Sequence, residues 1–216
     1  MSTRSKIDTV VFVVGESSRP QNWHLFGYNK NTTPNLDREP GIFKFNDMCT
    51  TAPYTAVAVP SMLSLEPIWN WDSIVSNKSL VSILGAAGYD TYWLSTQDVD
   101  GFGGIIPHIA AEAKHVQYFP RDYDGAIIPK FEQIVQNNHG KKKAIFIHIN
   151  GSHFAYSQRY PKEFDHFKSS SDDERDRIVA EYDNTILYTD WLLSTIINQL
   201  RLNGDPAILV YSSDHG

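Results

Sequence analysis

Short β-branched, apolar runs alternate along this chain with segments of helical periodicity, and this alternation constrains the fold more than any other feature. Residues 9–14 have the sequence TVVFVV and end at a glycine, which is typical of a buried parallel strand. Further strands are predicted at residues 91–94, 143–149 and 207–211, and helices at residues 79–87, 124–138 and 172–202. Strands that alternate with helices build right-handed βαβ units, so we predict an α/β fold whose mostly parallel central sheet is sandwiched by helices.

The composition and charge of the chain exclude several classes of protein. The chain has 216 residues, of which 41% are hydrophobic, so we expect a single domain with a sizeable core. A formal net charge of −6 argues against a nucleic-acid partner, because such binding draws on Lys and Arg side chains that neutralise phosphates. The sequence has no apolar stretch near the roughly 20 residues of a membrane span. Residues 1–6 lack the apolar core of a signal peptide.

Polar clusters follow several of the predicted strands at the point where each strand ends. Glu16 follows the first strand, and Asp214 and His215 follow the last one. His153 comes a short loop after the strand at residues 143–149. In an open α/β sheet the ligand crevice lies beyond the carboxyl ends of the strands, where carboxylates and imidazoles would suit a divalent cation, with zinc as the favoured metal. Each residue alone is more often a helix cap or a turn residue, so the hypothesis depends on the joint pattern.

A group of hydroxyl side chains lies ahead of another predicted helix, in residues 50–64. Proline is best tolerated in the first turn of a helix, so Pro60 places Thr55 at or just before the helix start. A hydroxyl in that position could serve phosphoryl or sulfuryl transfer, because backbone N–H groups receive the anion and a metal lowers the pKa of the hydroxyl. The alternative is that Thr55 is an ordinary N-cap.

A series of motifs, in order along nearly the whole chain, resembles one enzyme family. The motifs are VVGESSR at residues 13–19, HLFGY at 24–28, TTPNL at 32–36, TAVAVPSMLS at 55–64, GYDTYWLS at 88–95, HINGSH at 148–153, RYP at 159–161, YDNTILYTD at 182–190 and SDHG at 213–216. They resemble the phosphoethanolamine transferases, membrane-anchored periplasmic enzymes of the sulfatase and alkaline phosphatase superfamily that include enzymes modifying lipid A. The resemblance implies an alkaline-phosphatase-like α/β fold.

The resemblance also implies roles for individual residues. Zn²⁺ would be held by four ligands, namely Glu16, Thr55, Asp214 and His215. Thr55 would also be the nucleophile, which becomes phosphorylated and then passes its group to an acceptor in ping-pong fashion. His153 would contact the transferred phosphate or protonate the leaving alkoxide, and the amide of Gln97 would touch the substrate.

Partners and location follow from the same resemblance. The donor would be a phospholipid, phosphatidylethanolamine in particular, and the acceptor a hydroxyl or phosphate of an envelope glycan or glycolipid such as lipopolysaccharide. The full-length protein would work as a monomer at the periplasmic face of the bacterial inner membrane, held there by an anchor that is absent from this chain. Because relatives continue past the SDHG motif, we expect residues 1–216 to be one catalytic domain whose C-terminal portion is missing.

The chain departs from the family in its cysteines, and two other functions fit the same motifs. Relatives carry several disulfides, whereas Cys49 is alone here, and we expect it to be a buried small hydrophobe. A sulfatase or phosphodiesterase of the same superfamily would use the same metal and nucleophile with water as the acceptor. A fragment that only binds metal or ligand, without catalysis, is the other alternative.

Overall fold

The strands of the computed structural model, which describes residues 7–98 and 104–216, form one parallel sheet in the order β3-β2-β4-β1-β5. Their bounds are β1 Thr9–Gly15, β2 Asp90–Ser95, β3 His115–Tyr118, β4 Lys143–His148 and β5 Ala207–Ser213. Every pairing between neighbouring strands is parallel, which confirms the predicted α/β class. Parallel strands need long crossovers, and helices supply most of them here.

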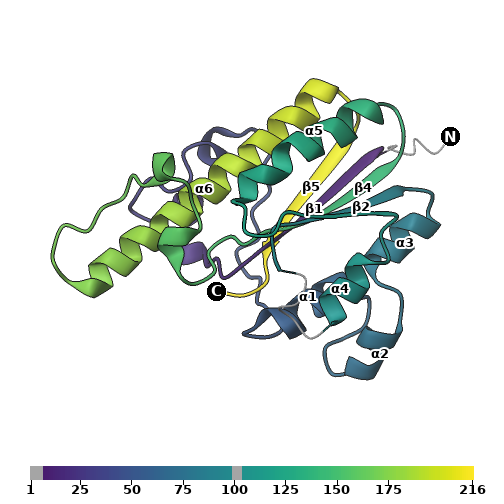
Figure 1. The fold of residues 1–216 in the computed structure, drawn as a ribbon, viewed down its shortest axis with the longest axis horizontal. Helices are drawn as coiled ribbons and strands as arrows, with labels where there is room; N and C mark the ends of the chain where they lie inside the picture. The colour runs from purple at the N-terminus through teal and green to yellow at the C-terminus, as the bar shows by residue number, and fades with distance from the viewer. Residues whose placement is uncertain (1–6, 99–103) are drawn as a thin grey trace.

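Helices cover both faces of this sheet, so the molecule has three layers (Figure 1). One face carries α5 (Ile128–Asn137) and α6 (Glu174–Asn203), and the other carries α1 (Thr55–Leu63), α3 (Leu80–Ala86) and α4 (Ile105–Ala110), with α2 (Trp71–Ser76) beyond them. Short 3₁₀ helices lie at Pro20–Asn22, His24–Phe26, Leu36–Arg38, Asp124–Ile127, Tyr156–Gln158 and Lys162–Phe164. In the parts of the chain described, no helix combines the length and the apolar character that crossing a membrane requires.

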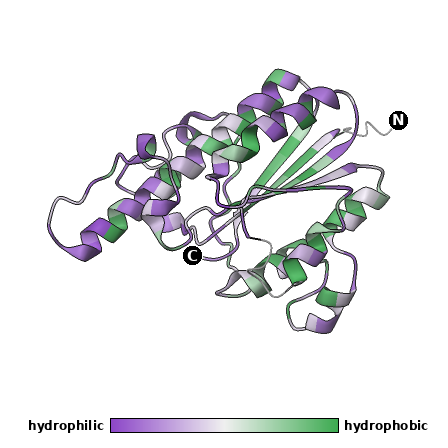
Figure 2. Ribbon diagram, in the orientation of Figure 1, coloured by the Kyte–Doolittle hydropathy of each residue, from purple (hydrophilic) through white to green (hydrophobic). Residues whose placement is uncertain are grey.

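The hydrophobic core lies on both sides of the sheet, and apolar residues are concentrated in its central strands and in the helices of the α1/α3/α4 face (Figure 2). On the α5/α6 side, Val11 and Val13 of β1 belong to the same buried cluster as Ile186 of α6. On the other side, Val14 of β1 is in a cluster with Val59 of α1. Every residue of β4 is buried, as expected for a strand with neighbours on both edges and helices on both faces.

The register of the central strands decides where the functional residues lie. Val14 of β1 is opposite His148 of β4 on one side and Ser212 of β5 on the other. The carboxyl ends of these three strands are therefore level, and the loops that follow them meet at one edge of the sheet. This edge is where the polar clusters of the sequence were predicted to gather.

Several local features differ from the sequence-based prediction. α4, which begins at Ile105, and the short strand β3 were not among the predicted elements. Pro60 lies well inside α1 rather than in its first turn, although the helix does begin at Thr55. Cys49 was predicted to be buried and is exposed, because residues 44–51 form no regular element and do not pack into the core.

Candidate metal centre

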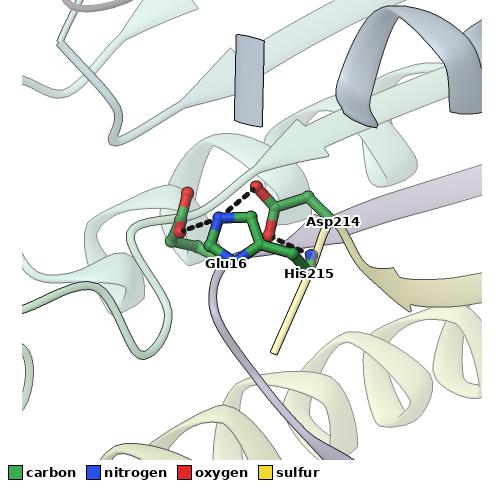
Figure 3. A group of neighbouring side chains, drawn as sticks. All are labelled: Glu16, Asp214 and His215. Atoms are coloured by element: carbon green, nitrogen blue, oxygen red, sulfur yellow. Dashed lines mark hydrogen bonds and ion pairs between the residues drawn. The ribbon is translucent and has the colours of Figure 1, made fainter. Parts of the chain in front are cut away.

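Two carboxylates and an imidazole from opposite ends of the sequence meet at the carboxyl edge of the sheet (Figure 3). Glu16 follows β1, and Asp214 and His215 follow β5; the two strands are paired as far as Gly15 and Ser213. His215 Nε2 lies 3.3 Å from Glu16 Oε1 and 3.5 Å from Asp214 Oδ2. One ligand atom of each residue lies within 4.8 Å of the other two, so a single ion could contact all three.

This cluster buries two carboxylates beside a single imidazole, so its negative charge is poorly compensated by the protein. The exposed fraction is 1% for Glu16 and 0% for Asp214, and Asp214 Oδ2 has no hydrogen-bond partner among the described residues. Burial, and then the nearby Asp214 carboxylate, raise the pKa of Glu16, against the opposing influence of hydrogen bonds from Ser17 and Thr55 and of His215. A buried, unbonded carboxylate oxygen is costly unless a cation pairs with it. The oxygen and nitrogen donors fit Zn²⁺, which the sequence predicted here.

Thr55 contributes a hydroxyl to this cluster from the start of α1. The backbone of Tyr54 is extended, and the helix begins at the next residue, so the Thr55 side chain projects from the first turn. Its Oγ1 donates a hydrogen bond to Glu16 Oε2 at 3.0 Å and lies 3.4 Å from His215 Nε2. The structure therefore brings together all four predicted ligands, with the N-terminus of a helix beside them.

A further layer of hydrogen bonds orients the carboxylates. Ser17 Oγ donates to Glu16 Oε1 at 2.6 Å, and the Ser17 amide donates to Asp214 Oδ1 at 3.1 Å. Gln97 Nε2 donates to Glu16 Oε2 at 3.2 Å and to the carbonyl of Ile149 at 3.0 Å. Gln97, for which substrate contact was predicted, thus holds the Glu16 carboxylate. Ser17 was missed, because a serine after a strand carries no signal of its own in one sequence.

The loop after β4 forms one wall of the site and is fixed by a buried acid. Asp124 accepts hydrogen bonds from the amides of Asn150 and Gly151, each at 2.9 Å. Burial raises the pKa of Asp124, against these hydrogen bonds. A Cβ on Gly151 would lie 3.0 Å from the backbone N and O of Glu16, and φ is +48° there, so a glycine suits this tight packing against Glu16. Asp124 was missed as well, because an acid before a helix resembles an ordinary cap.

The imidazole of His153 lies outside this group of contacts, although its loop touches the site. The amide of the preceding Ser152 donates to the carbonyl of Glu16 at 2.9 Å. His153 itself is exposed; its Nδ1 lies 2.6 Å from the carbonyl oxygen of Phe154, and Arg159 Nε donates to the His153 carbonyl at 3.0 Å. His153 is therefore an exposed residue of a loop that contacts Glu16, and its imidazole is in contact with Phe154 and Arg159 and with none of the four predicted ligands.

Comparison with known proteins identifies similar chains. A family model described as Sulfatase matches residues 8–216. The protein YhbX of Escherichia coli K12 is 35% identical over 97% of this chain, and the phosphoethanolamine transferase EptC of the same organism is 30% identical over 96%. The chain spans 38% and 39% of the lengths of these two relatives.

Solved structures agree with the sequence matches. The C-terminal periplasmic domain of E. coli EptC, determined in complex with Zn, superposes with a TM-score of 0.90 at 28% identity, covering 98% of this chain and 64% of that one. The soluble domain of lipooligosaccharide phosphoethanolamine transferase A from Neisseria meningitidis gives a TM-score of 0.83 at 28% identity, covering 99% of this chain and 69% of that one.

Proposed function

The chain belongs to the sulfatase family, and from this premise we propose that it forms the zinc-binding centre of a phosphoethanolamine transferase. The observation that carries the proposal is the Thr55 hydroxyl, which lies at a helix N-terminus in contact with Glu16 and His215 of the buried cluster. The names of EptC and of the Neisseria enzyme support phosphoethanolamine as the transferred group. The zinc complex of EptC supports the choice of metal.

The proposed metal ligands are Glu16, Thr55, Asp214 and His215. Zinc bound there would lower the pKa of the Thr55 hydroxyl and offset negative charge on the transferred phosphoryl group. The donor atoms already lie close together, and Ser17 and Gln97 hold the Glu16 carboxylate in place. Little reorganisation of side chains would therefore accompany binding.

In the first step of the proposed reaction, Thr55 Oγ1 attacks the phosphorus of a phosphatidylethanolamine donor. The P–O bond to diacylglycerol breaks, and the phosphoethanolamine group becomes bonded to Thr55. The Thr55 proton leaves along its hydrogen bond to Glu16 Oε2. The leaving alkoxide needs a proton, and we propose that His153 donates it from Nε2, since its Nδ1 faces the Phe154 carbonyl.

In the second step an acceptor hydroxyl attacks the phosphorylated Thr55, with neutral His153 taking the proton. The P–O bond to Thr55 breaks, and the proton taken up by Glu16 in the first step returns to Thr55 Oγ1, which restores the hydroxyl. We propose an envelope glycan or glycolipid as the acceptor, which the name of the Neisseria enzyme supports. The whole protein would then act at the periplasmic face of the bacterial inner membrane, where lipid donor and acceptor are both present, as the periplasmic domain of EptC suggests.

A test of this function is to trap the covalent intermediate. The zinc-loaded protein is incubated with phosphatidylethanolamine in detergent and without acceptor, and the peptide that carries Thr55 is then analysed by mass spectrometry. We expect a phosphoethanolamine adduct on Thr55. The adduct should be absent from Thr55→Ala and retained in Thr51→Ala, a matched control because Thr51 is exposed and outside the cluster.

The same experiment separates the alternatives. Rapid release of free phosphoethanolamine without any acceptor would show a hydrolase instead of a transferase. A protein that binds zinc but never forms the adduct would have a binding function only. Failure of the wild-type protein to bind zinc at saturating concentration would refute the proposed metal centre itself.

A further inference from the structure

One buried phenol on α6 holds both ends of the turn that follows Glu16, the first of the proposed metal ligands. Tyr182 is 7% exposed, and its hydroxyl accepts a hydrogen bond from the amide of Arg19 at 2.9 Å. The same hydroxyl donates to the carbonyl of Ser17 at 2.8 Å. A single oxygen atom from a helix more than 160 positions away thereby closes the turn at residues 17–19.

This turn has a backbone conformation that needs such support. Ser17 has a φ of +50°, in the left-handed region, which costs a residue with a side chain about 1–2 kcal/mol. In that conformation its hydroxyl reaches Glu16 and its amide reaches Asp214. The strained residue is therefore the one that orients both carboxylates, and it loses that orientation if the turn relaxes.

We propose that Tyr182 is a positioning residue of the metal centre, acting on Glu16 and Asp214 through the turn at residues 17–19. The Tyr182 ring is itself held in place, because Tyr156 packs edge-on against it with ring centroids 5.0 Å apart. The guanidinium of Arg19 lies 5.7 Å from the centre of the same ring. The proposal depends on the metal centre and is independent of the group that the enzyme transfers.

The contacts of the neighbouring Asp183 hold the segment after this turn independently of the Tyr182 hydroxyl. The next residue, Asp183, binds a different part of the chain, accepting hydrogen bonds from Asn22 at 2.7 Å and from Tyr28 at 3.0 Å, and pairing with Lys30 at 2.7 Å. These contacts anchor residues 22–30 to α6 without the phenol. Loss of the Tyr182 hydroxyl should therefore release the Ser17 carbonyl and the Arg19 amide, while Ser18 keeps its hydrogen bonds to Ser213 and Trp23 and the rest of the segment stays docked.

The experiment compares Tyr182→Phe with Tyr92→Phe in the full chain. Tyr92 is a matched control, because it is also 7% exposed, and its hydroxyl donates to Asp90 at the amino end of β2, away from the metal centre. Zinc affinity is measured by competition with a chromophoric chelator, and the d–d spectrum of the Co²⁺-substituted protein reports ligand geometry. Loss of an outer partner typically lowers metal affinity about 10–100-fold, and we expect about tenfold for Tyr182→Phe.

The expected result is weaker zinc binding and an altered cobalt spectrum in Tyr182→Phe, with both properties unchanged in Tyr92→Phe. Lower thermal stability with wild-type zinc affinity and an unchanged cobalt spectrum would reduce Tyr182 to a structural residue and overturn the proposal. If the wild type bound no zinc, the proposed function would fail first, so the two failures are distinct.

A second variant tests the proposal if Tyr182→Phe does not fold. Tyr156→Leu removes the ring that packs edge-on against Tyr182 but keeps the Tyr182 hydroxyl. We expect zinc affinity to fall about threefold. This is less than the usual effect of removing a group that hydrogen-bonds a metal ligand, because the Tyr182 hydroxyl is displaced and not removed. Wild-type affinity and an unchanged cobalt spectrum in this variant would contradict a role for the phenol in positioning the ligands.

Discussion

Charged side chains are buried at both ends of the central sheet, in an oppositely charged pair at one end and in an acid-rich cluster at the other. At the amino end, the ammonium of Lys143 is fully buried and lies 2.9 Å from Asp205, and it also donates to the carbonyls of Asn138 and Lys141. At the carboxyl end, Glu16 and Asp214 are buried together with a single imidazole, and one carboxylate oxygen lacks a hydrogen bond to any described residue. Lys143 and Asp205 are thus matched in charge, whereas the cluster at the carboxyl end has the charge and donors that a cation would complete.

The largest effect expected from this comparison concerns stability without metal. Lys143→Ala should lower the free energy of unfolding by about 3 kcal/mol, because it leaves the buried Asp205 carboxylate without its main partner. Urea unfolding in the presence of a chelator measures the change.

The matched variant at the other end is Asp214→Asn. Under the same metal-free conditions its stability should equal or exceed that of the wild type, because the change removes one of two neighbouring negative charges. Its stabilisation by added zinc should be lost. A metal-free loss as large as that of Lys143→Ala would show that the carboxyl end is balanced without a cation.

Two glycines, one near each end of the sheet, allow the packing at the two ends to be compared. Gly151 and Gly140 both have positive φ, of +48° and +70°, but a Cβ on Gly151 would meet the backbone of Glu16, whereas nothing lies within 4 Å of one on Gly140. Gly151→Ala should therefore lower the free energy of unfolding by about 2 kcal/mol and weaken zinc binding.

Gly140→Ala is the control, since it adds the same methyl group near the amino end of the sheet. It should lower the free energy of unfolding by about 1 kcal/mol, from backbone strain alone, and leave zinc affinity unchanged. Both values come from chemical denaturation and chelator competition. Equal effects of the two substitutions on zinc affinity would indicate that the loop after β4 does not support Glu16.

The smallest expected effect is on the pH dependence of stability, which should have opposite signs at the two ends of the sheet. Burial would raise the pKa of Asp205, but hydrogen bonds from Lys143 and Gly140 outweigh it and lower this pKa to about 2. The stability from Asp205 is therefore present above its unfolded pKa of 3.8 and is lost as pH falls toward 2. The pKa of Glu16 is raised above 4.5, so the metal-free protein loses stability from this group as pH rises through the folded pKa.

Unfolding free energies measured from pH 2 to 7 without metal test this contrast. Asp205→Asn should remove the acid-side slope, and Glu16→Gln the slope above pH 4.5. Zinc affinity should rise with pH over the range in which Glu16 ionises, since the metal displaces its proton. A pH profile of stability that neither variant alters would show that Asp205 and Glu16 are not the groups responsible for these slopes.

Much of the fold and the cluster of ligands could be predicted from the sequence. The apolar runs that became β1, β2, β4 and β5 have the composition of buried parallel strands, and their polar ends meet because parallel strands share a carboxyl edge. Glu16, Asp214 and His215 were placed by that rule, and their contact was confirmed. The start of α1 was predicted correctly from the hydroxyl and proline pattern around Thr55.

Other features depend on tertiary contacts that leave no local pattern. Lys143 belongs to a run of three lysines that resembles a solvated turn, yet it is fully buried because Asp205 lies across from it. β3 has only four residues and is partly exposed, so its apolar pattern is weak. Ser17 and Tyr182 orient the site through hydrogen bonds between residues far apart in sequence, and only the three-dimensional structure shows them.

The strand order has a consequence for how the chain is made. β1 lies between β4 and β5, so the segment TVVFVV ends at Gly15 but its neighbours begin only at Lys143 and Ala207. During translation this apolar, β-branched segment emerges long before either partner, a period in which it can associate with other chains or with a chaperone. The cluster itself cannot assemble until His215 has left the ribosome. Binding of the proposed metal would therefore have to wait until β5 and the two residues after it have been made.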